Sequence, residues 1–150
     1  MIFVRGEQVS GEYRGKGSLL DAEGWFNTRD GGYLDDGGYL FLEGRMDDVI
    51  VRGGENMSPG EIEDVLLTHE ALLDACVIGI PDERMGEVGM AFVVPVPGVT
   101  LDPAILLAWS RDNMANYKVP RHFEIMQELP CNASGKVLKN ELRERAKQIV

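Results

Sequence analysis

The feature that most constrains the fold is the start of a helix at Pro59. Ser58 is a helix-capping residue type, and Pro59 suits the first helical position because its missing N–H needs no partner there. Glu61 stands three residues after Ser58, which is the spacing of a capping box. The sequence therefore predicts a helix from Pro59 to Thr68. Its buried face would consist of Ile62, Val65 and Leu66.

A short strand and a glycine pair precede this helix. The segment Asp48–Arg52 carries the β-branched residues of a strand, and Gly53-Gly54 ends it with backbone that can adopt positive φ or lie close to a ligand. At the start of this strand, Arg45, Asp47 and Asp48 form a cluster of charged residues. A hinge between two rigid parts needs such a short polar segment, in which few residues change φ and ψ. A solvated turn followed by an ordinary helix start explains the same residues, and the spacing alone favours that simpler interpretation.

The rest of the second half predicts an α+β fold. Asp102 is a capping residue and Pro103 suits the first position of a second helix, which would turn Ile105, Leu106 and Trp109 inward. We expect a small mixed β-sheet of about three strands flanked by helices. The strand-like segments are Leu72–Ile80, Gly89–Val96 and Val119–Met126, and the helical segments run from Pro103 to about Met114 and from about Val137 to Gln148.

The first part of the chain, residues 1–44, is rich in glycine and turn residues and predicts β structure. Asp35-Asp36-Gly37 is a turn signal between Gly31–Leu34 and Gly38–Leu42, which gives a hairpin. A hairpin alone is not stable in water, so it needs support from a larger body. Without that support we expect Gly11–Gly17 to lack regular structure.

Composition excludes several classes of function. Acidic residues outnumber basic ones by 25 to 15, which argues against a nucleic acid or an anionic membrane as partner. No apolar run has the length of a transmembrane span and no signal peptide is evident, so we expect a soluble, cytoplasmic protein. Cys76 and Cys131 are too few for a disulfide framework, and His69 and His122 lack the spacing of metal ligands, so no metal site is predicted.

Taken as a whole, the segment Gly44–Glu63, GRMDDVIVRGGENMSPGEIE, resembles the hinge region of the adenylate-forming (AMP-binding) superfamily. This superfamily includes acyl-CoA synthetases, luciferases and the adenylation domains of peptide synthetases. Three further segments resemble the family's GWFxTGD, YKVP and LPxxxSGK stretches, in the same order: Gly24–Asp30 (GWFNTRD), Tyr117–Pro120 (YKVP) and Leu129–Lys136 (LPCNASGK).

The resemblance implies a domain division and an activity. Residues 1–44 would be the terminal β segment of a large N-terminal adenylation domain, and residues 45–150 the C-terminal lid of an acyl-CoA synthetase or fatty-acid–CoA ligase. The parent enzyme would convert a carboxylic acid, ATP and CoA into acyl-CoA, AMP and pyrophosphate, with Mg²⁺ bound through ATP. The partners implied are the large domain and these substrates, and the 150-residue chain alone would be inactive.

The resemblance also assigns roles to individual residues. Lys136 would be the catalytic lysine, which bridges the substrate carboxylate and the α-phosphate during adenylation. Asp30 and Arg45 would bind the ribose of the nucleotide, although Arg29 replaces the family glycine beside Asp30 and brings bulk and charge there. Asp47 would be the hinge about which the lid turns between adenylation and thioester formation.

The CoA-binding residues are likewise assigned by resemblance. Gly53, Gly54 and Glu55 would line the tunnel for pantetheine, where a side chain at either glycine would block the thiol. Met85 stands where some relatives place an aromatic residue that stacks on adenine. The candidates for the CoA phosphates are Arg84, Lys118 and Arg121.

Each assignment has a simpler alternative. The glycines can serve only a turn, Asp30 can be a turn-forming residue, and Lys136 can be a surface lysine at a helix start. A stand-alone, non-catalytic binding module with the lid fold is a second hypothesis. A lid from a peptide synthetase or a luciferase-like enzyme is a third.

Overall fold

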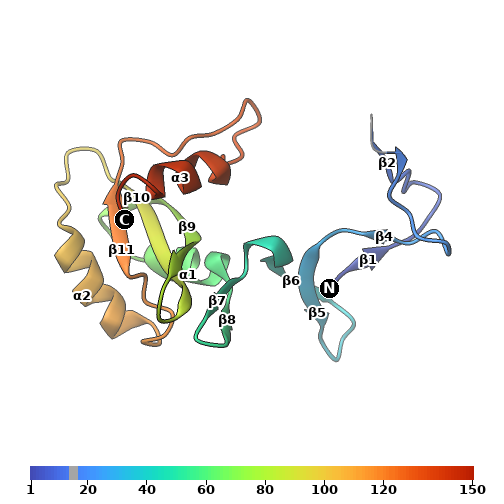
Figure 1. Cartoon of the computed structure of the whole chain (residues 1–150), viewed down its shortest axis with the longest axis horizontal. Helices are drawn as coiled ribbons and strands as arrows, with labels where there is room; N and C mark the ends of the chain where they lie inside the picture. The colour runs from blue at the N-terminus through green and yellow to red at the C-terminus, as the bar shows by residue number, and fades with distance from the viewer. Residues whose placement is uncertain (14–16) are drawn as a thin grey trace. The chain divides into compact units, whose positions relative to one another are not determined.

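The computed structural model describes residues 1–13 and 17–150, so the expectation for Gly11–Gly17 falls in part outside the described residues. The chain divides into two compact units, Met1–Asp47 and Asp48–Val150. Figure 1 labels most of the helices and strands of the two units.

The first unit consists of short antiparallel strand pairs. Strands β1 (Phe3–Val4) and β4 (Phe26–Asn27) form one pair, β2 (Glu12–Tyr13) and β3 (Gly17–Ser18) a second, and β5 (Asp30–Leu34) and β6 (Leu40–Arg45) a third.

The third pair is the predicted hairpin. Its turn is closed by Asp35, whose Oδ1 accepts hydrogen bonds from the N–H groups of Gly37 and Tyr39, each at 2.9 Å. Such an Asx turn is the reason that aspartate favours this position. The register of the hairpin places Asp30 directly opposite Arg45.

The second unit is organised around strand β10 (Gly86–Pro95). Strand β9 (Leu72–Asp82) pairs antiparallel with its whole length, whereas β11 (His122–Ile125) runs parallel to it along Met90–Val93. At its start, Gly86 pairs with Arg52 of β7 (Ile50–Arg52), which forms a hairpin with β8 (Glu55–Met57). A short 3-10 helix, η1 (Met46–Asp48), leads into β7. The sheet is therefore mixed, and the predicted α+β fold is confirmed, but among the described residues the sheet has five strands instead of about three. The strand predicted at Asp48–Arg52 joins it through Gly86, and the Gly53-Gly54 turn adds β8 as a further strand.

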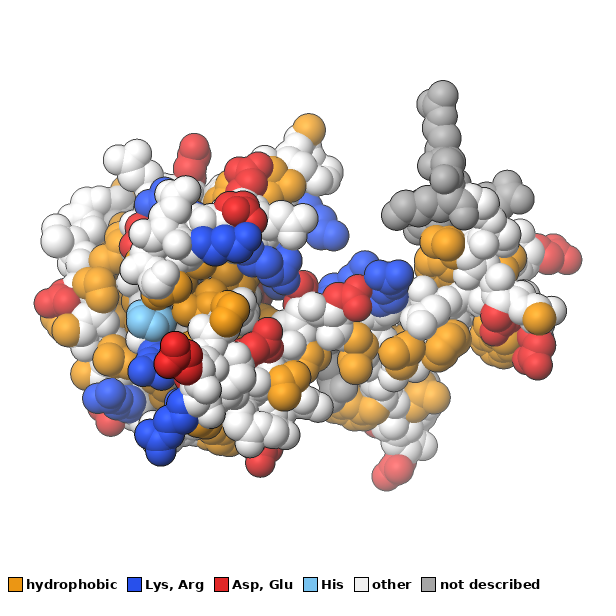
Figure 2. Space-filling model, viewed as in Figure 1, with side chains coloured by type: hydrophobic (Ala, Val, Ile, Leu, Met, Phe, Trp, Pro, Cys, Tyr) orange, Lys and Arg blue, Asp and Glu red, His pale blue; other side chains and the backbone are white. Residues whose placement is uncertain are grey.

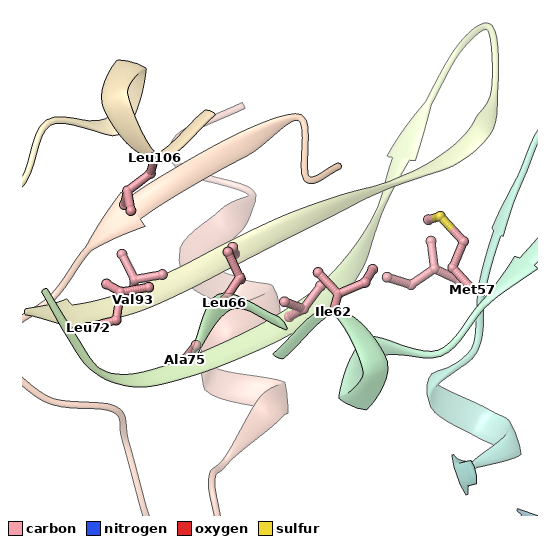
Figure 3. Packing of buried hydrophobic residues seen from close by; sticks show 10 residues of the cluster. Met57, Ile62, Leu66, Leu72, Ala75, Val93 and Leu106 are labelled. Atoms are coloured by element: carbon pink, nitrogen blue, oxygen red, sulfur yellow. The ribbon is translucent and has the colours of Figure 1, made fainter. Parts of the chain in front are cut away.

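Helices cover both faces of this sheet. One face packs against α1 (Pro59–Leu66) and α2 (Pro103–Asn113), and the other against α3 (Lys139–Ala146). Figure 1 shows α2 and α3 flanking the strands, and Figure 3 shows the cluster on the α1 and α2 side. Successive residues of β9 alternate between the two clusters, with Ala75 and Val77 in the first and Cys76 and Ile78 in the second. Because both faces are buried there, the central run of β9, residues 75–80, is apolar on both sides.

Cys76 is a small core residue, as predicted. Its side chain is buried, and burial together with nearby Glu63 raises the pKa of the thiol to about 12. The thiol therefore stays protonated at neutral pH and serves packing.

Two local predictions about the helices are wrong. Ser58 is the N-cap of α1 by position, but its side chain makes no cap hydrogen bond to the helix, and Glu61 pairs with Lys118 instead of closing a capping box. In α2, Asp102 caps as predicted by accepting from the Ala104 N–H at 2.8 Å, but Ile105 is 61% exposed. Leu106 is buried and Trp109 packs against the same core cluster, both as predicted, and Ser110 is buried as well.

Packing against the core predicts different stability effects for two adjacent leucines at the end of α1, the last helical residue Leu66 and the C-cap Leu67. Leu66 is fully buried, whereas Leu67 is 43% exposed. We expect Leu66→Ala to lower the free energy of unfolding by about 2–5 kcal/mol, because it leaves a cavity against the sheet. Leu67→Ala, the matched control, should cost under about 1 kcal/mol. Urea unfolding followed by circular dichroism measures both, and equal losses would contradict the packing described.

Candidate functional site

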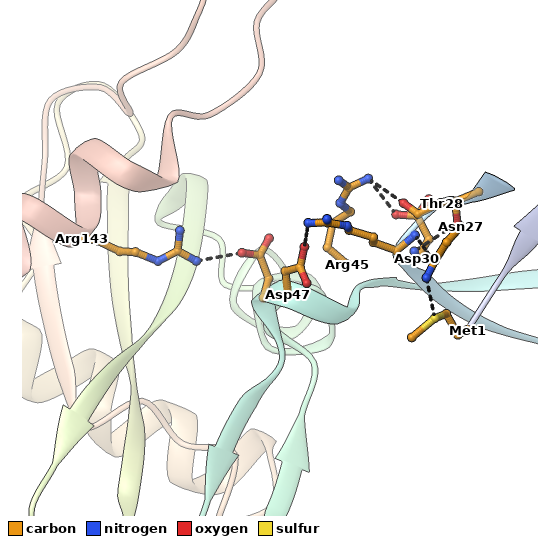
Figure 4. Close-up of polar contacts among 9 residues, drawn as sticks. Met1, Asn27, Thr28, Asp30, Arg45, Asp47 and Arg143 are labelled. Carbon is orange, nitrogen blue, oxygen red and sulfur yellow. Dashed lines mark hydrogen bonds and ion pairs between the residues drawn. The ribbon is translucent and has the colours of Figure 1, made fainter. Parts of the chain in front are cut away.

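The predicted nucleotide residues Asp30 and Arg45 are brought together by the β5–β6 hairpin. Arg45 Nη1 lies 3.2 Å from Asp30 Oδ1 and donates to the Thr28 carbonyl oxygen, also at 3.2 Å. Figure 4 shows these three residues clustered at the end of the hairpin. Both side chains of the ion pair remain partly exposed, so a ligand can reach the carboxylate. The arrangement suits a carboxylate that accepts hydrogen bonds from sugar hydroxyls.

Arg29 has an unusual backbone conformation. Its φ is 61°, and among the described residues it is the one residue other than glycine that has a positive φ. This left-handed conformation favours glycine, the residue of the family segment that Arg29 replaces. Its guanidinium pairs with Asp47, with 3.2 Å between Nη1 and Oδ2, as the dashed line at Asp47 in Figure 4 marks. The positive charge of Arg29 is therefore paired with a carboxylate of the same chain.

The carboxylates of Asp47 and Asp48 lie on either side of the division between the units. Asp47 is bound by Arg29 of the first unit. Asp48 is bound within the second unit by Lys139 Nζ at 3.2 Å and Arg143 Nη2 at 2.8 Å. Partial burial opposes ionisation of Asp48, but the two cations outweigh it and lower the pKa of this carboxyl group. Two adjacent aspartates are therefore anchored to different units.

Gly53 and Gly54 form the two-residue turn between β7 and β8. Their φ values are +59° and +91°, which L side chains rarely adopt, and both are positive as in a type I′ hairpin turn. The Gly53 N–H donates to the Met85 carbonyl oxygen at 2.8 Å, and a Cβ at Gly53 would lie 2.7 Å from Met85 Cε. A Cβ at Gly54 would meet no atom within 4 Å. The turn thus favours glycine at both positions for conformation, whereas a Cβ at Gly53 would displace only the flexible end of the Met85 side chain. Neighbouring Glu55 is exposed.

The three cations predicted to bind CoA phosphates are separated. Arg84 and Arg121 line one surface pocket, whereas Lys118 lines another between α1 and the end of α2. Arg121 Nη1 pairs with Asp82 Oδ2 at 2.5 Å, and Lys118 pairs with Glu61, which raises the pKa of Lys118. Within the described residues, Arg84 makes no ion pair. Arg84 is the cation of this set that needs no exchange of partner to bind an anion.

Arg52 is a structural residue of the site that sequence reasoning missed. Its Nη1 donates to the carbonyl oxygens of Asn116 and Tyr117, at 3.3 and 2.6 Å. It therefore ties the glycine turn to the YKVP segment, which lies far away in sequence. An arginine at the end of an apolar strand was the available signal, but its partners are backbone carbonyls, which no side-chain motif reveals.

Lys136 lies on a tight loop that is built by Asn132. Asn132 Oδ1 accepts hydrogen bonds from the N–H groups of Ser134 and Lys136, at 3.0 and 2.9 Å, and from Ser134 Oγ at 2.8 Å. Gly135 adopts a φ of 81° within this loop. The Lys136 residue is exposed, and its ammonium makes no ion pair in the described part of the chain. A fixed backbone thus presents a free cation to solvent.

Among the described residues, no group of His, Cys, Asp and Glu side chains could hold a metal ion. His69 instead packs edge to face on Trp109, with 4.9 Å between ring centroids. No helix over the described ranges combines the length and the apolar character that crossing a membrane requires.

Comparison with known proteins defines the class to which this fold and loop arrangement belong. A family model described as the AMP-binding enzyme C-terminal domain matches residues 61–136, half of the chain. The chain therefore belongs to the family of AMP-binding enzyme C-terminal domains.

Individual relatives are ligases that are several times longer. The 3-[(3aS,4S,7aS)-7a-methyl-1,5-dioxo-octahydro-1H-inden-4-yl]propanoyl:CoA ligase of Rhodococcus jostii is 45% identical over 150 residues, which cover 97% of this chain and 29% of that protein. ATP-bound MatB from Rhodopseudomonas palustris superposes with a TM-score of 0.80 at 36% identity, covering 87% of this chain and 26% of that one. The o-succinylbenzoate CoA synthetase (MenE) of Bacillus subtilis, in complex with its acyl-adenylate intermediate, gives 0.76 at 37% identity and covers 87% and 27%.

The ion pairs of Asp48 predict a stability difference between neighbouring aspartates. Asp48→Asn should lower the free energy of unfolding by about 1–3 kcal/mol, because it weakens hydrogen bonds to two cations. Asp47→Asn is the control: its carboxylate belongs to an exposed pair, and the change should stay within about 1 kcal/mol. Urea titration at neutral pH measures both, and a larger effect at Asp47 would contradict the assignment.

The same pair predicts a pH dependence. The pKa of Asp48 is lowered in the folded chain from an ordinary value of 3.8, so the folded state binds the proton more weakly than the unfolded state. Its contribution to stability is therefore full at pH values above 3.8 and is lost as pH falls through the lower, folded pKa. The stability difference between the wild type and Asp48→Asn should shrink over that range. A difference that grows on acidification would show that the sign is wrong.

Proposed function

We propose that this chain is the C-terminal lid of an AMP-forming acyl-CoA synthetase, together with the last β segment of its large adenylation domain. The parent reaction joins a carboxylic acid to CoA, with conversion of ATP into AMP and pyrophosphate. The observation that carries the proposal is Lys136, whose exposed ammonium is unpaired within the described residues and stands on a loop held by Asn132. Membership of the AMP-binding family supports it.

Lys136 would act in the first half-reaction. Attack of a carboxylate on the α-phosphorus brings two anions together, and charge develops on the phosphoryl oxygens. An ammonium placed between the two groups offsets their repulsion and stabilises that developing charge. The Asn132 hydrogen bonds hold the Lys136 backbone before substrate arrives, so little ordering is left to the reaction itself.

Asp30 and Arg45 would bind the nucleotide. The Asp30 carboxylate would accept hydrogen bonds from the two ribose hydroxyls, while Arg45, at a distance of 3.2 Å, would keep it oriented. Mg²⁺ would enter with the ATP phosphates, since the described residues offer it no cluster of ligands.

A second surface of the lid would serve thioester formation. After adenylation the lid would turn about Asp47 and present the Gly53-Gly54 turn and Glu55 to the pantetheine arm. Arg84 and Arg121 line one pocket, which suits the phosphates of CoA. Lys118 would have to exchange Glu61 for a phosphate oxygen in order to take part.

The large domain would be the partner of the first unit. The β5–β6 hairpin exposes apolar side chains, visible at the surface in Figure 2, and these include Tyr33, Leu34, Tyr39, Leu40, Phe41 and Leu42. An exposed apolar hairpin of this kind is suited to burial against another body. The chain spans less than a third of the length of its ligase relatives, which leaves room for an acid pocket and an ATP site elsewhere.

The role of Lys136 predicts a selective loss of activity. In the ligase formed with the large domain, Lys136→Ala should slow pyrophosphate release by about 10²–10³, because one preorganised donor to the transition state is removed. Thioester formation from a supplied acyl-adenylate should continue at the wild-type rate, since it uses the other surface. Lys147→Ala, which removes an exposed lysine paired with Glu144, should alter neither step. Full adenylation by Lys136→Ala would refute the proposed role.

A further inference from the structure

Arg29 binds the predicted hinge segment at two points. Its carbonyl oxygen accepts a hydrogen bond from the Met46 N–H at 2.9 Å, and its guanidinium pairs with the Asp47 carboxylate at 3.2 Å. Both contacts lie within the first unit, which ends at Asp47. Arg29 also directly precedes Asp30 in the chain, so one turn of backbone connects the proposed ribose site to the proposed hinge.

The backbone of Arg29 shows that the side chain is kept at some cost. A φ of 61° is strained for an arginine and free of strain for a glycine, the residue of the matching family segment. A glycine would make the turn and could donate and accept the same backbone hydrogen bonds, but it could not reach Asp47. What the arginine adds is therefore the ion pair with Asp47.

The far side of the hinge is anchored as well. Asp48 is held by Lys139 and Arg143 of the second unit. With both carboxylates bound, the side chain of Asp47 is tied to the first unit and that of Asp48 to the second. Loss of the Arg29 contact would release the Asp47 side chain and leave the segment that joins the units with one restraint fewer.

We propose that Arg29 is a positioning residue for the lid: it holds Asp47 on the first unit and thereby sets the balance between the adenylating and thioester-forming orientations. This inference rests on the proposed function. The pair is well exposed, with 66% and 60% of the two side chains accessible, so its effect is modest. For an orientation equilibrium near balance, a change of about 2- to 5-fold in the population ratio is the expected size.

The direct test measures the distribution of distances between one site on each unit in the 150-residue chain. Cys131 is exposed and Cys76 is buried, so a spin label attaches at Cys131, and Glu23→Cys provides a second exposed site on the first unit. Pulsed dipolar spectroscopy then gives the distance distribution. Arg29→Gln keeps a Cβ, and with it the strain of the backbone, but it shortens the side chain and removes the charge, so it should broaden the distribution. Arg29→Lys should restore the narrower one.

The second test separates the half-reactions in the ligase formed with the large domain. Arg29→Gln should change the ratio of the adenylation rate to the thioester-forming rate by about 2- to 5-fold, with the unfolding midpoint unchanged. In an Asp47→Asn background the same substitution should have no further effect on ratio or distance, because the partner carboxylate is already neutral. If Arg29 had only a structural role, Arg29→Gln would lower both rates together, and it would do so in the Asp47→Asn background as well.

The outcomes distinguish the two proposals. If neither half-reaction occurs, the proposed function fails, whereas the distance distributions still decide whether Arg29 restrains the hinge. If both half-reactions occur but the ratio or the distance distribution of Arg29→Gln equals that of the wild type, the inference about Arg29 is overturned.

Discussion

Burial of strand β10 on both of its faces is the constraint on which the second unit depends. Phe92 packs towards α3 and Val93 towards α1 and α2, and neither is accessible to solvent. A strand that is buried on both sides holds its neighbours in register, because a slip of one residue would exchange the two clusters. The loops that leave this rigid sheet, the Gly53-Gly54 turn and the Lys136 loop, are therefore held at defined places.

Most of the cationic side chains of the second unit are paired with carboxylates. Acidic residues outnumber basic ones by 25 to 15, and much of the positive charge of the second unit is neutralised within it. Lys118, Arg121, Arg143 and Lys139 are all paired with carboxylates. An anionic ligand would thus be attracted by single cations on particular loops and by little else, and Lys136 and Arg84 are two such cations that make no ion pair among the described residues. The positions of single cations, and not the electrostatic field of the whole chain, would provide recognition of the anion.

Under the proposed function, the connection between the units would act as a pivot. Ion pairs bind the carboxylates of Asp47 and Asp48, the first within one unit and the second within the other. Exposed ion pairs are weak enough to let this balance be tuned by single substitutions. The replacement of a glycine by Arg29 is such a substitution, since it introduces a charged contact at the expense of backbone strain.

Sequence alone determined the types and order of the main helices and strands of the second unit, the β5–β6 hairpin, the Asp102 cap and the α+β class, because each follows from local spacing and turn chemistry. Through their motifs it also predicted roles for Lys136, Asp30 and Arg45, which stay predictions. Only the tertiary structure decided that Glu61 pairs with Lys118 instead of closing a capping box, that Ile105 faces solvent, and that Arg84 and Arg121 share a pocket which Lys118 does not line. These outcomes depend on which distant segments the sheet brings together, and a side chain's local pattern carries no record of its partner across the fold.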